Sequence, residues 1–141
     1  MTKKIGRKII RLKKVDSTNT YLKENSDLLK NEGLVVIAEM QTSGRGRLGR
    51  KFVSLPKKNI TFSVVLHPNL PFEKVQLYSL LAGVVVSRVL GNYIDEVNLK
   101  WPNDVLVRGN KICGILTESF TSKNHNFPYL ILGIGLNSKG L

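Results

Sequence analysis

Residues 96–137 restrict the fold more than any other part of the chain, because short apolar runs alternate there with turn sequences. "EVNLK" leads into a Trp-Pro-Asn-Asp break, "DVLV" and "KICGILTES" flank a turn at "RGNK", and "YLILGIGLN" follows a turn at "SKNHNFP". Runs of this length, rich in Val, Ile and Leu and bounded by Gly, Pro and Asn, are typical of β-strands. Tight turns between strands produce hairpins, so this region predicts antiparallel strands of one sheet.

The first half of the chain adds two helices and two strands. The sequence "DST" at 16–18 consists of residues that cap helix N-termini, and an amphipathic pattern follows at 19–30. "LVVIAEM" at 34–40 predicts a buried strand, and "NITFSVVL" at 59–66 alternates apolar residues on one face. Apolar residues cover most of a helix at 72–91, which favours packing on a sheet. The expected order α-β-β-α-β-β-β predicts an α+β domain with a mixed β-sheet flanked by helices.

Length and composition exclude several classes of protein. A chain of 141 residues, 42% hydrophobic and 23% charged, supports one globular domain. We find no apolar run close to the ~18 residues of a membrane-spanning helix, and the N-terminus lacks the apolar region of a signal peptide. The single cysteine, Cys113, rules out an internal disulfide and is expected in the core. We therefore expect a cytoplasmic protein that does not engage a membrane.

The net charge of +12 favours an anionic ligand, which could be nucleic acid, anionic lipid or a phosphorylated molecule. Seven basic residues lie between positions 3 and 14, and we expect them to form a solvated face. Six more lie between Glu39 and Glu73, where no acidic residue occurs. Several of these are held between glycines, so we expect this second group to bind a ligand.

The stretch "SGRGRLGRK" at 43–51 contains most of that second group and resembles two phosphate-binding motifs. It satisfies G-x-G-x-x-G, but a dinucleotide-binding loop must open a helix and be followed by an acidic residue about 20 positions later. Pro56 and the absence of a helical pattern after Gly49 argue against that helix, and the next acidic residue is Glu73. Arg50 stands where a P-loop needs its lysine, so both motifs are rejected.

Two interpretations of this stretch remain. Arginines and glycines suit a nucleic-acid-binding loop, but single-strand binders add stacking aromatic residues, and Phe52 is the one aromatic residue nearby. Alternatively, glycines free backbone N–H groups to bind an anion, while the arginines donate paired hydrogen bonds to carboxylate or phosphate. A loop with this much positive charge repels itself, so we expect it to be mobile without ligand and ordered with it.

Other stretches carry polar residues at the ends of predicted strands. "KWPNDVLV" combines a cation, an aromatic ring and two polar side chains, although a simple β-turn explains it equally well. Lys111 is placed at the mouth of a hairpin, and Gly114 lies inside a strand, where close approach of a ligand or backbone is the usual reason. His67 and His125 have no neighbours at ligand spacing, which argues against a zinc site. Many cations and no evident nucleophile favour catalysis by positioning and charge stabilisation of a phosphate-containing substrate.

Taken together, these stretches resemble the biotin protein ligases, or biotin–[acetyl-CoA-carboxylase] ligases. The matching segments are "DSTN" (16–19), "AEMQTSGRGRLGRKF" (38–52), "KWPNDVLV" (100–107), "KICGILTE" (111–118) and "GIGLN" (133–137). They occur in the order and spacing of that family and cover nearly the whole chain. The resemblance implies a catalytic domain related to class II aminoacyl-tRNA synthetases, and a reaction in two steps. Biotin and ATP would form biotinyl-5′-AMP, which would then acylate a lysine of a biotin carboxyl carrier protein.

The resemblance also implies roles for individual residues. The expected biotin-binding residues are Ser17, Thr18, Asn19, Gln41, Gly44, Arg45, Gly46, Arg47, Lys111 and Gly114. The expected ATP-binding residues are Arg45, Arg50, Lys51, Asn103 and Asn137. Lys111 and Arg47 are the expected catalytic residues, with Lys111 stabilising the charge that develops between the biotin carboxylate and the α-phosphate. Asn103 or Asp104 is expected to assist Mg²⁺, and no protein-bound metal centre is expected.

We expect residues 1–141 to form one catalytic domain that is incomplete at its C-terminal end. The family continues with further catalytic structure and a small β-barrel, and 15 residues before "DSTN" leave no room for a winged helix. We therefore expect no sequence-specific DNA binding, while a homodimer is compatible with the resemblance. Phe52 replaces the usual tryptophan, Thr117 an aliphatic residue and Ser138 a valine. A basic nucleic-acid-binding module and a lipoate or octanoate ligase remain the alternatives.

Overall fold

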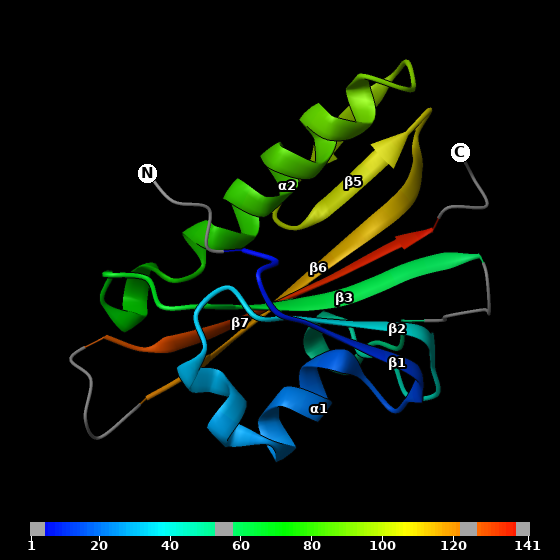
Figure 1. Ribbon diagram of the computed structural model, residues 1–141. Coiled ribbons are helices and arrows are strands. Elements are labelled where there is room, and N and C mark those ends of the chain that lie inside the picture. The colour runs from blue at the N-terminus through cyan, green and yellow to red at the C-terminus, as the bar shows by residue number, and fades with distance from the viewer. Residues whose placement is uncertain (1–4, 53–57, 122–126, 138–141) are drawn as a thin grey trace.

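The computed structural model describes residues 5–52, 58–121 and 127–137 of the 141-residue chain. In that part, seven strands form one sheet in the order β1-β2-β3-β7-β6-β5-β4 (Figure 1). The strands are β1 (Ile9–Val15), β2 (Val35–Gln41), β3 (Asn59–Leu66), β4 (Val97–Lys100), β5 (Asp104–Val107), β6 (Asn110–Phe120) and β7 (Tyr129–Asn137). β1 and β2 are parallel and the other neighbours are antiparallel, which confirms the expected mixed sheet.

Short helices connect and cover these strands. They are α1 (Thr18–Glu24), α2 (Leu77–Gly91) and the 3-10 helices η1 (Ser26–Lys30), η2 (Arg47–Gly49) and η3 (Phe72–Lys74). The helix expected at 19–30 is thus split in two. Asn25 leaves the helical conformation (φ −119°, ψ 60°), and both its backbone N–H and its side-chain Nδ2 donate to Tyr21 O. This local side-chain bond competes with the helical one and ends α1.

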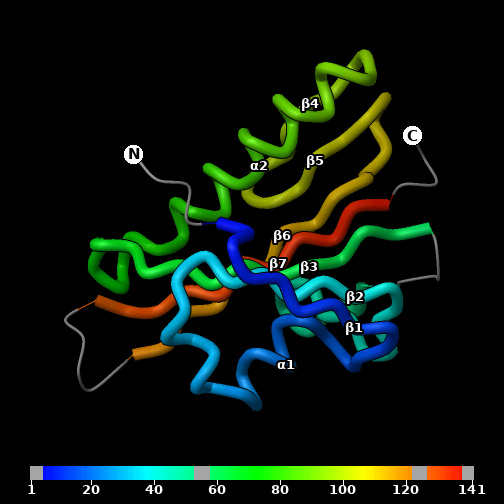
Figure 2. The backbone as a smooth tube through the Cα atoms, viewed as in Figure 1, coloured from blue at the N-terminus to red at the C-terminus, as the bar shows by residue number. Residues whose placement is uncertain are grey.

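β1 was not predicted, because its lysines and arginines conceal a period-two pattern. Arg11 and Lys13 are exposed, as expected for a solvated face, but Ile10 and Leu12 pack against the core beneath α1. The strand pairs in parallel with β2, which lies beyond α1 in the sequence. Figure 2 shows β1 at one edge of the sheet and β4 beside α2 at the other.

The predicted strands of the second half are confirmed, with one addition. β3 and β7 cover 59–66 and 129–137 as expected. Four strands rather than three follow α2, because the break at 101–103 separates two short strands, β4 and β5. The "RGNK" hairpin turns at Arg108 and Gly109, with φ angles of 50° and 81°, which is the backbone that a two-residue hairpin turn needs. The expected turn "SKNHNFP" and His125 lie mostly or wholly outside the described residues.

Two hydrophobic cores lie on opposite faces of the sheet. Val64 and Val65 are neighbours on β3 but enter different cores, and so do Leu132 and Ile131 on β7. Successive side chains of a strand point to opposite faces, so the two cores are separated by the sheet. One core contains Ala82 and Leu90 of α2, and the other contains Leu22 of α1. Figure 1 shows the two helices on different sides of the sheet. Cys113 is fully buried, as predicted.

α2 packs on β4, β5 and β6 through its small residues. A Cβ atom at Gly83 would lie 3.1 Å from Leu99 Cδ2, so the glycine allows the close approach. Leu77, Leu81 and Val85 are about half exposed on the outer side. The segment Phe72–Gly91, which includes η3 and α2, reaches a mean hydropathy of 1.2 and is, in the described part, long and apolar enough to cross a membrane by length and composition alone. A helix that packs on a sheet reaches the same length and hydropathy.

Candidate active site on the α1 face of the sheet

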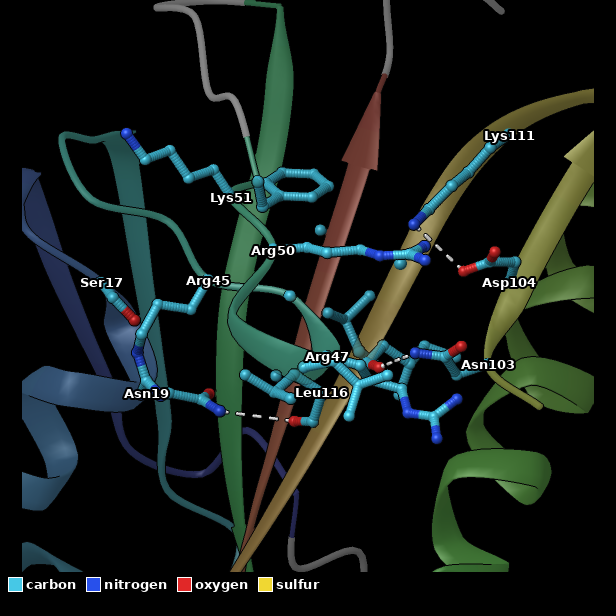
Figure 3. A pocket seen from close by; sticks show the side chains of 18 of the residues that line it. Ser17, Asn19, Arg45, Arg47, Arg50, Lys51, Asn103, Asp104, Lys111 and Leu116 are labelled. Carbon is cyan, nitrogen blue, oxygen red and sulfur yellow. Dashed lines mark hydrogen bonds and ion pairs between the residues drawn. The ribbon is translucent and has the colours of Figure 1, made fainter.

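A cavity of about 270 Å³ opens on the sheet face that α1 covers. Gly133 and Gly135 line it. They lie on the same face of β7 as Ile131, which belongs to the core beneath α1. The remaining walls come from the N-terminus of α1, the end of β2, the segment 45–52, the turn at 100–104 and β6. Figure 3 shows Ser17, Asn19 and Arg45 on one side of the cavity, and Asn103, Asp104 and Lys111 on the other.

Ser17 places the N-terminus of α1 at this cavity. Its backbone is extended (φ −157°, ψ 140°), and its Oγ accepts a hydrogen bond from Thr20 N at 3.3 Å. The serine therefore caps the helix, as the sequence predicted. Because capping starts the helix at Thr18, the next two side chains turn inward, and Thr18 and Asn19 are each 3% exposed.

Thr18, Asn19 and Gln41 line the bottom of the cavity, and together with the buried Ser63 beneath them they are called here the floor. Gln41 Oε1 accepts hydrogen bonds from Thr18 N at 2.8 Å and from Thr18 Oγ1 at 3.2 Å. These two bonds identify the oxygen of the Gln41 amide and turn its nitrogen away from Thr18, toward Gly44. The Gln41 amide nitrogen is therefore oriented before any ligand enters.

Ser63 is a member of the floor that the sequence analysis missed. It is fully buried, and its Oγ lies 2.7 Å from Thr18 Oγ1 and 2.5 Å from Asn19 Oδ1, to either of which it can donate. Asn19 Nδ2 in turn donates to Leu116 O at 3.3 Å. The sequence contains one signal of this role. Thr61 and Ser63 are polar residues that alternate with apolar ones inside a strand that is buried on both faces.

The strand glycines make room for side chains, as predicted for glycines inside strands. A Cβ atom at Gly133 would lie 2.5 Å from Asn19 Oδ1, and one at Gly135 would lie 2.4 Å from the Phe52 ring. At Gly114 the nearest atoms, 3.4 Å away, belong to the Lys111 side chain. The sheet surface below the cavity is therefore hollowed to receive Asn19 and Phe52.

Residues 43–52 form a short hairpin over the cavity, called here the glycine–arginine loop. Phe52 N donates to Gly44 O at 2.8 Å, and Gly46 N donates to Arg50 O at 2.6 Å. The tip is the 3-10 turn η2, where Leu48 has a φ of 56° and is 88% exposed. No α-helix follows Gly49 in the described residues before β3. The rejection of the dinucleotide-binding and P-loop motifs is therefore supported.

The three arginines of the loop are held differently. Arg47 and Arg50 are exposed at the tip, which we call the rim of the cavity. Arg45 is half-buried, and its Nη1 and Nη2 donate to the two carboxylate oxygens of Glu118 at 3.2 and 2.8 Å. Burial raises the pKa of Glu118, but hydrogen bonds from Arg45 and Asn19 and the charges of Arg45 and Lys23 outweigh it, so the pKa lies below its usual 4.5.

The wall opposite α1 carries Lys111 and Asp104. Lys111 Nζ lies 3.1 Å from Asp104 Oδ1, and the lysine side chain is 51% exposed. That carboxylate oxygen is buried and accepts no well-aligned hydrogen bond from any described residue. Asn103 Nδ2 donates to Ile115 O at 2.7 Å, which fixes the turn onto β6. Burial raises the pKa of Cys113, next to this wall, to about 12, so its thiol stays protonated at neutral pH.

A second cavity of about 230 Å³ adjoins the first. It is lined by Lys51, Phe52, Asn59, Lys111, Ile112, Cys113 and Asn137. Lys51, Phe52 and Lys111 line both cavities. Asn137 lies in the second cavity, and Gly44 lines neither, although it is buried beside Gln41. The other residues expected from sequence all line the first cavity.

The described residues contain no group of three or more His, Cys, Asp or Glu side chains that could hold a metal ion. Asp104, which contacts Lys111, and its neighbour Asn103 are oxygen-bearing side chains that line the first cavity. His67 lies elsewhere, stacked on Tyr129 with a centroid distance of 4.2 Å. The arrangement provides two adjoining cavities with two lysines, Lys51 and Lys111, at their junction, which suits two anionic groups held side by side.

Comparison with known proteins identifies the family. The bifunctional ligase/repressor BirA of Bacillus subtilis is 34% identical over 137 residues, which are 96% of this chain and 42% of that protein. A biotin–[acetyl-CoA-carboxylase] ligase of Mycobacterium tuberculosis is 40% identical over 80% of this chain and 45% of its own length. The solved biotin protein ligase of Aquifex aeolicus in complex with biotin and ATP superimposes with a TM-score of 0.76 at 40% identity, over 93% of this chain and 52% of that one.

The chain therefore spans about half the length of the curated relatives it matches. The family model that matches residues 12–137 is described as the biotin/lipoate A/B protein ligase family. It includes all the motifs on which the resemblance was based. On this match, and on the fold and the cavity it encloses, the chain belongs to the biotin/lipoate A/B protein ligase family.

Proposed function

We propose that this chain carries the catalytic site of an ATP-dependent biotin protein ligase. The observation that carries the proposal is the pair of adjoining cavities that share Lys51, Phe52 and Lys111. A ligase of this kind must bring a carboxylate and a triphosphate together, and a cation at the junction offsets their repulsion. The names of the relatives and the A. aeolicus complex with biotin and ATP support these two substrates.

In the first cavity, the floor is the proposed site of the biotin ring system. Hydrogen bonds within the protein already orient the polar atoms of the floor. We propose that Gln41 Nε2 and Ser17 bind the ureido head of biotin. The carboxylate end would then point toward Lys111. Arg50, Lys51, Asn103 and Asn137 are the residues we propose to surround the nucleotide, with Arg47 closing over both substrates.

The proposed first step forms one bond and breaks one. An oxygen of the biotin carboxylate attacks the α-phosphorus of ATP, the bond from that phosphorus to the bridging oxygen breaks, and pyrophosphate leaves. Lys111 would stabilise the negative charge that develops at the α-phosphate. In the second step, a lysine amine of a biotin carboxyl carrier protein attacks the acyl carbon of biotinyl-5′-AMP, and AMP leaves. Loop closure would keep water from the anhydride.

Asp104 and Asn103 fit a Mg²⁺ ion that is shared with the phosphates. Mg²⁺ usually binds through one or two carboxylates and completes its shell with phosphate oxygens and water. Asp104 Oδ1 is buried with Lys111 Nζ as its contact, so its charge is not used by other described groups. Mg²⁺ held there would neutralise phosphate charge. We also propose that the protein is cytoplasmic.

Biotin-dependent exchange of radiolabelled pyrophosphate into ATP tests the proposal. We expect exchange with biotin and none with lipoate or octanoate, which the family description makes the necessary controls. Exchange with lipoate but not with biotin would mean that lipoate, rather than biotin, is the substrate. Salt-dependent binding to DNA or RNA without any exchange would favour the nucleic-acid-binding alternative instead.

A further inference from the structure

Glu118 joins three parts of the candidate site, although it lines neither of the two cavities itself. It lies on β6, and its side chain is 19% exposed. Its Oε1 accepts from Arg45 Nη2 at 2.8 Å and from Asn19 Nδ2 at 3.0 Å. Its Oε2 accepts from Arg45 Nη1 and from Lys23 Nζ, both at 3.2 Å. One carboxylate therefore contacts the glycine–arginine loop, the floor and the outer side of α1.

Among the described residues, Arg45 makes the loop's polar side-chain contact with β6, and each of its three guanidinium nitrogens donates one hydrogen bond. Besides the two bonds to Glu118, its Nε donates to Thr20 Oγ1 at 3.2 Å. A paired carboxylate–guanidinium contact of this geometry is among the stronger polar interactions in proteins. Arg47, two residues later, is exposed. The loop thus has a fixed first half and an exposed tip.

We propose that Glu118 is a positioning residue for the ligase reaction, which anchors the loop through Arg45 while it orients the Asn19 amide in the floor. The effect of Glu118 on the ligase reaction rests on the proposed function. The anchoring of the loop does not depend on it. It assigns the Arg45 guanidinium to the protein rather than to the substrates, in contrast to the role that the resemblance implied. Loop motion is then confined to the tip, and the floor and the loop are coupled through one side chain.

The variant Glu118→Gln tests this coupling, because it keeps the shape of the side chain and removes its charge. In ligand-free protein, we expect hydrogen exchange of a peptide spanning 43–52 to rise about 10-fold or more, as expected when hydrogen bonds to a charged group are weakened. In pyrophosphate exchange, we expect the KM for biotin to rise by a similar factor while kcat changes less than about 3-fold, since Glu118 touches no reacting atom.

Lys23→Met is the matched control. It removes the ion pair between Lys23 and Glu118. The Lys23 side chain is 38% exposed, and this ion pair involves neither the loop nor the floor. We expect no change in loop exchange or in the KM for biotin. Arg45→Lys, which keeps the charge but loses the paired geometry, should reproduce the loosened loop if Glu118→Gln fails to fold.

These outcomes separate the anchor from the function. Unchanged exchange of the 43–52 peptide in both Glu118→Gln and Arg45→Lys, or an equal rise in Lys23→Met, overturns the anchoring. Loosened loops with an unchanged KM for biotin overturn the positioning role. If the unmodified protein gives no pyrophosphate exchange, the proposed function fails, while the hydrogen-exchange result still decides the anchor.

The pH dependence adds a further criterion. The pKa of Glu118 lies below 4.5, so the carboxylate contributes its stabilisation above that pH and loses it as the pH falls through the lowered value. After correction for intrinsic exchange, the difference between the unmodified protein and Glu118→Gln should be constant from pH 8 to pH 5. It should shrink only below 4.5. A difference that already disappears near neutral pH would contradict the assignment to this carboxylate.

Discussion

The floor and the rim of the first cavity are both polar, but the protein holds them in opposite ways. Thr18, Asn19 and Ser63 are at most 3% exposed and are hydrogen-bonded to one another. Arg47 and Arg50 are exposed on the loop tip, where Leu48 is 88% exposed. The floor is oriented before a ligand arrives, whereas the rim has little holding it in place.

Because of this difference, the floor and the rim contribute to ligand binding in different ways. A preorganised floor loses little freedom on binding, so its hydrogen bonds contribute directly to affinity and specificity. The cations of the rim must be ordered by the ligand, and their attraction is screened by salt. We therefore expect substitutions in the floor to act on fold and biotin affinity together, and substitutions in the rim to act on ligand binding without affecting the fold. Ligand-dependent ordering of the loop tip remains a prediction.

The largest effect is expected at Lys111, which belongs to neither region and lies where the two cavities meet. Lys111→Ala should lower pyrophosphate exchange about 100-fold or more, as for removal of a charge-stabilising donor. The fold should persist, because the side chain is half exposed. Lys30→Ala removes an exposed lysine remote from the cavity and should leave exchange unchanged. Normal exchange by Lys111→Ala would refute its role.

Gly133→Ala should damage the floor by steric conflict. The added Cβ would lie 2.5 Å from Asn19 Oδ1, so either the strand or the asparagine must shift. We expect a loss of about 1–3 kcal/mol in the free energy of unfolding, typical of overpacking, together with weaker biotin binding in calorimetry. Gly91→Ala, where the Cβ meets open space near the end of α2, is the control and should be neutral or stabilising. Equal stability of both variants would show that the floor is adaptable.

Ser63→Ala tests the floor by removing a hydrogen bond without adding volume. It leaves Asn19 Oδ1 and Thr18 Oγ1 without the donor that faces them, and we expect a cost of about 1–3 kcal/mol in urea unfolding. Ser87→Ala loses a hydrogen bond to Val84 O within α2 and should cost less, since the residue is only partly buried. A smaller cost for Ser63→Ala than for Ser87→Ala would argue against a preorganised floor.

The smallest effect on the free protein is expected at the rim. Arg50→Ala should change the free energy of unfolding by less than about 0.5 kcal/mol, as for exposed substitutions. It should weaken ATP binding several-fold at low salt and less at high salt, because exposed charges are screened. Arg88→Ala, an exposed arginine of α2, provides the charge-matched control. A salt-independent loss of affinity would mean that Arg50 is buried against the nucleotide.

Sequence analysis predicted the candidate site better than it predicted the connections within it. Residues expected from the motifs, such as Gln41, Asn103 and Lys111, do line one cavity. Ser63 and Glu118 were missed, because their partners lie far away in the sequence. Ser63 contacts Thr18 across 45 positions, and Glu118 contacts Arg45 across 73. No local pattern indicates such pairs.

Elements that depend on neighbouring residues could be predicted before the structure was known. Period-two alternation predicted β3 and β7, turn chemistry predicted the Arg108–Gly109 hairpin, and the N-cap at Ser17 predicted the start of α1. Only the tertiary structure decided that the basic segment 9–15 is an edge strand in parallel with β2. It also decided that Arg45 turns inward to Glu118 while Arg47 stays exposed. Those outcomes depend on burial and charge supplied by distant strands, whereas periodicity, turns and caps are properties of the local chain.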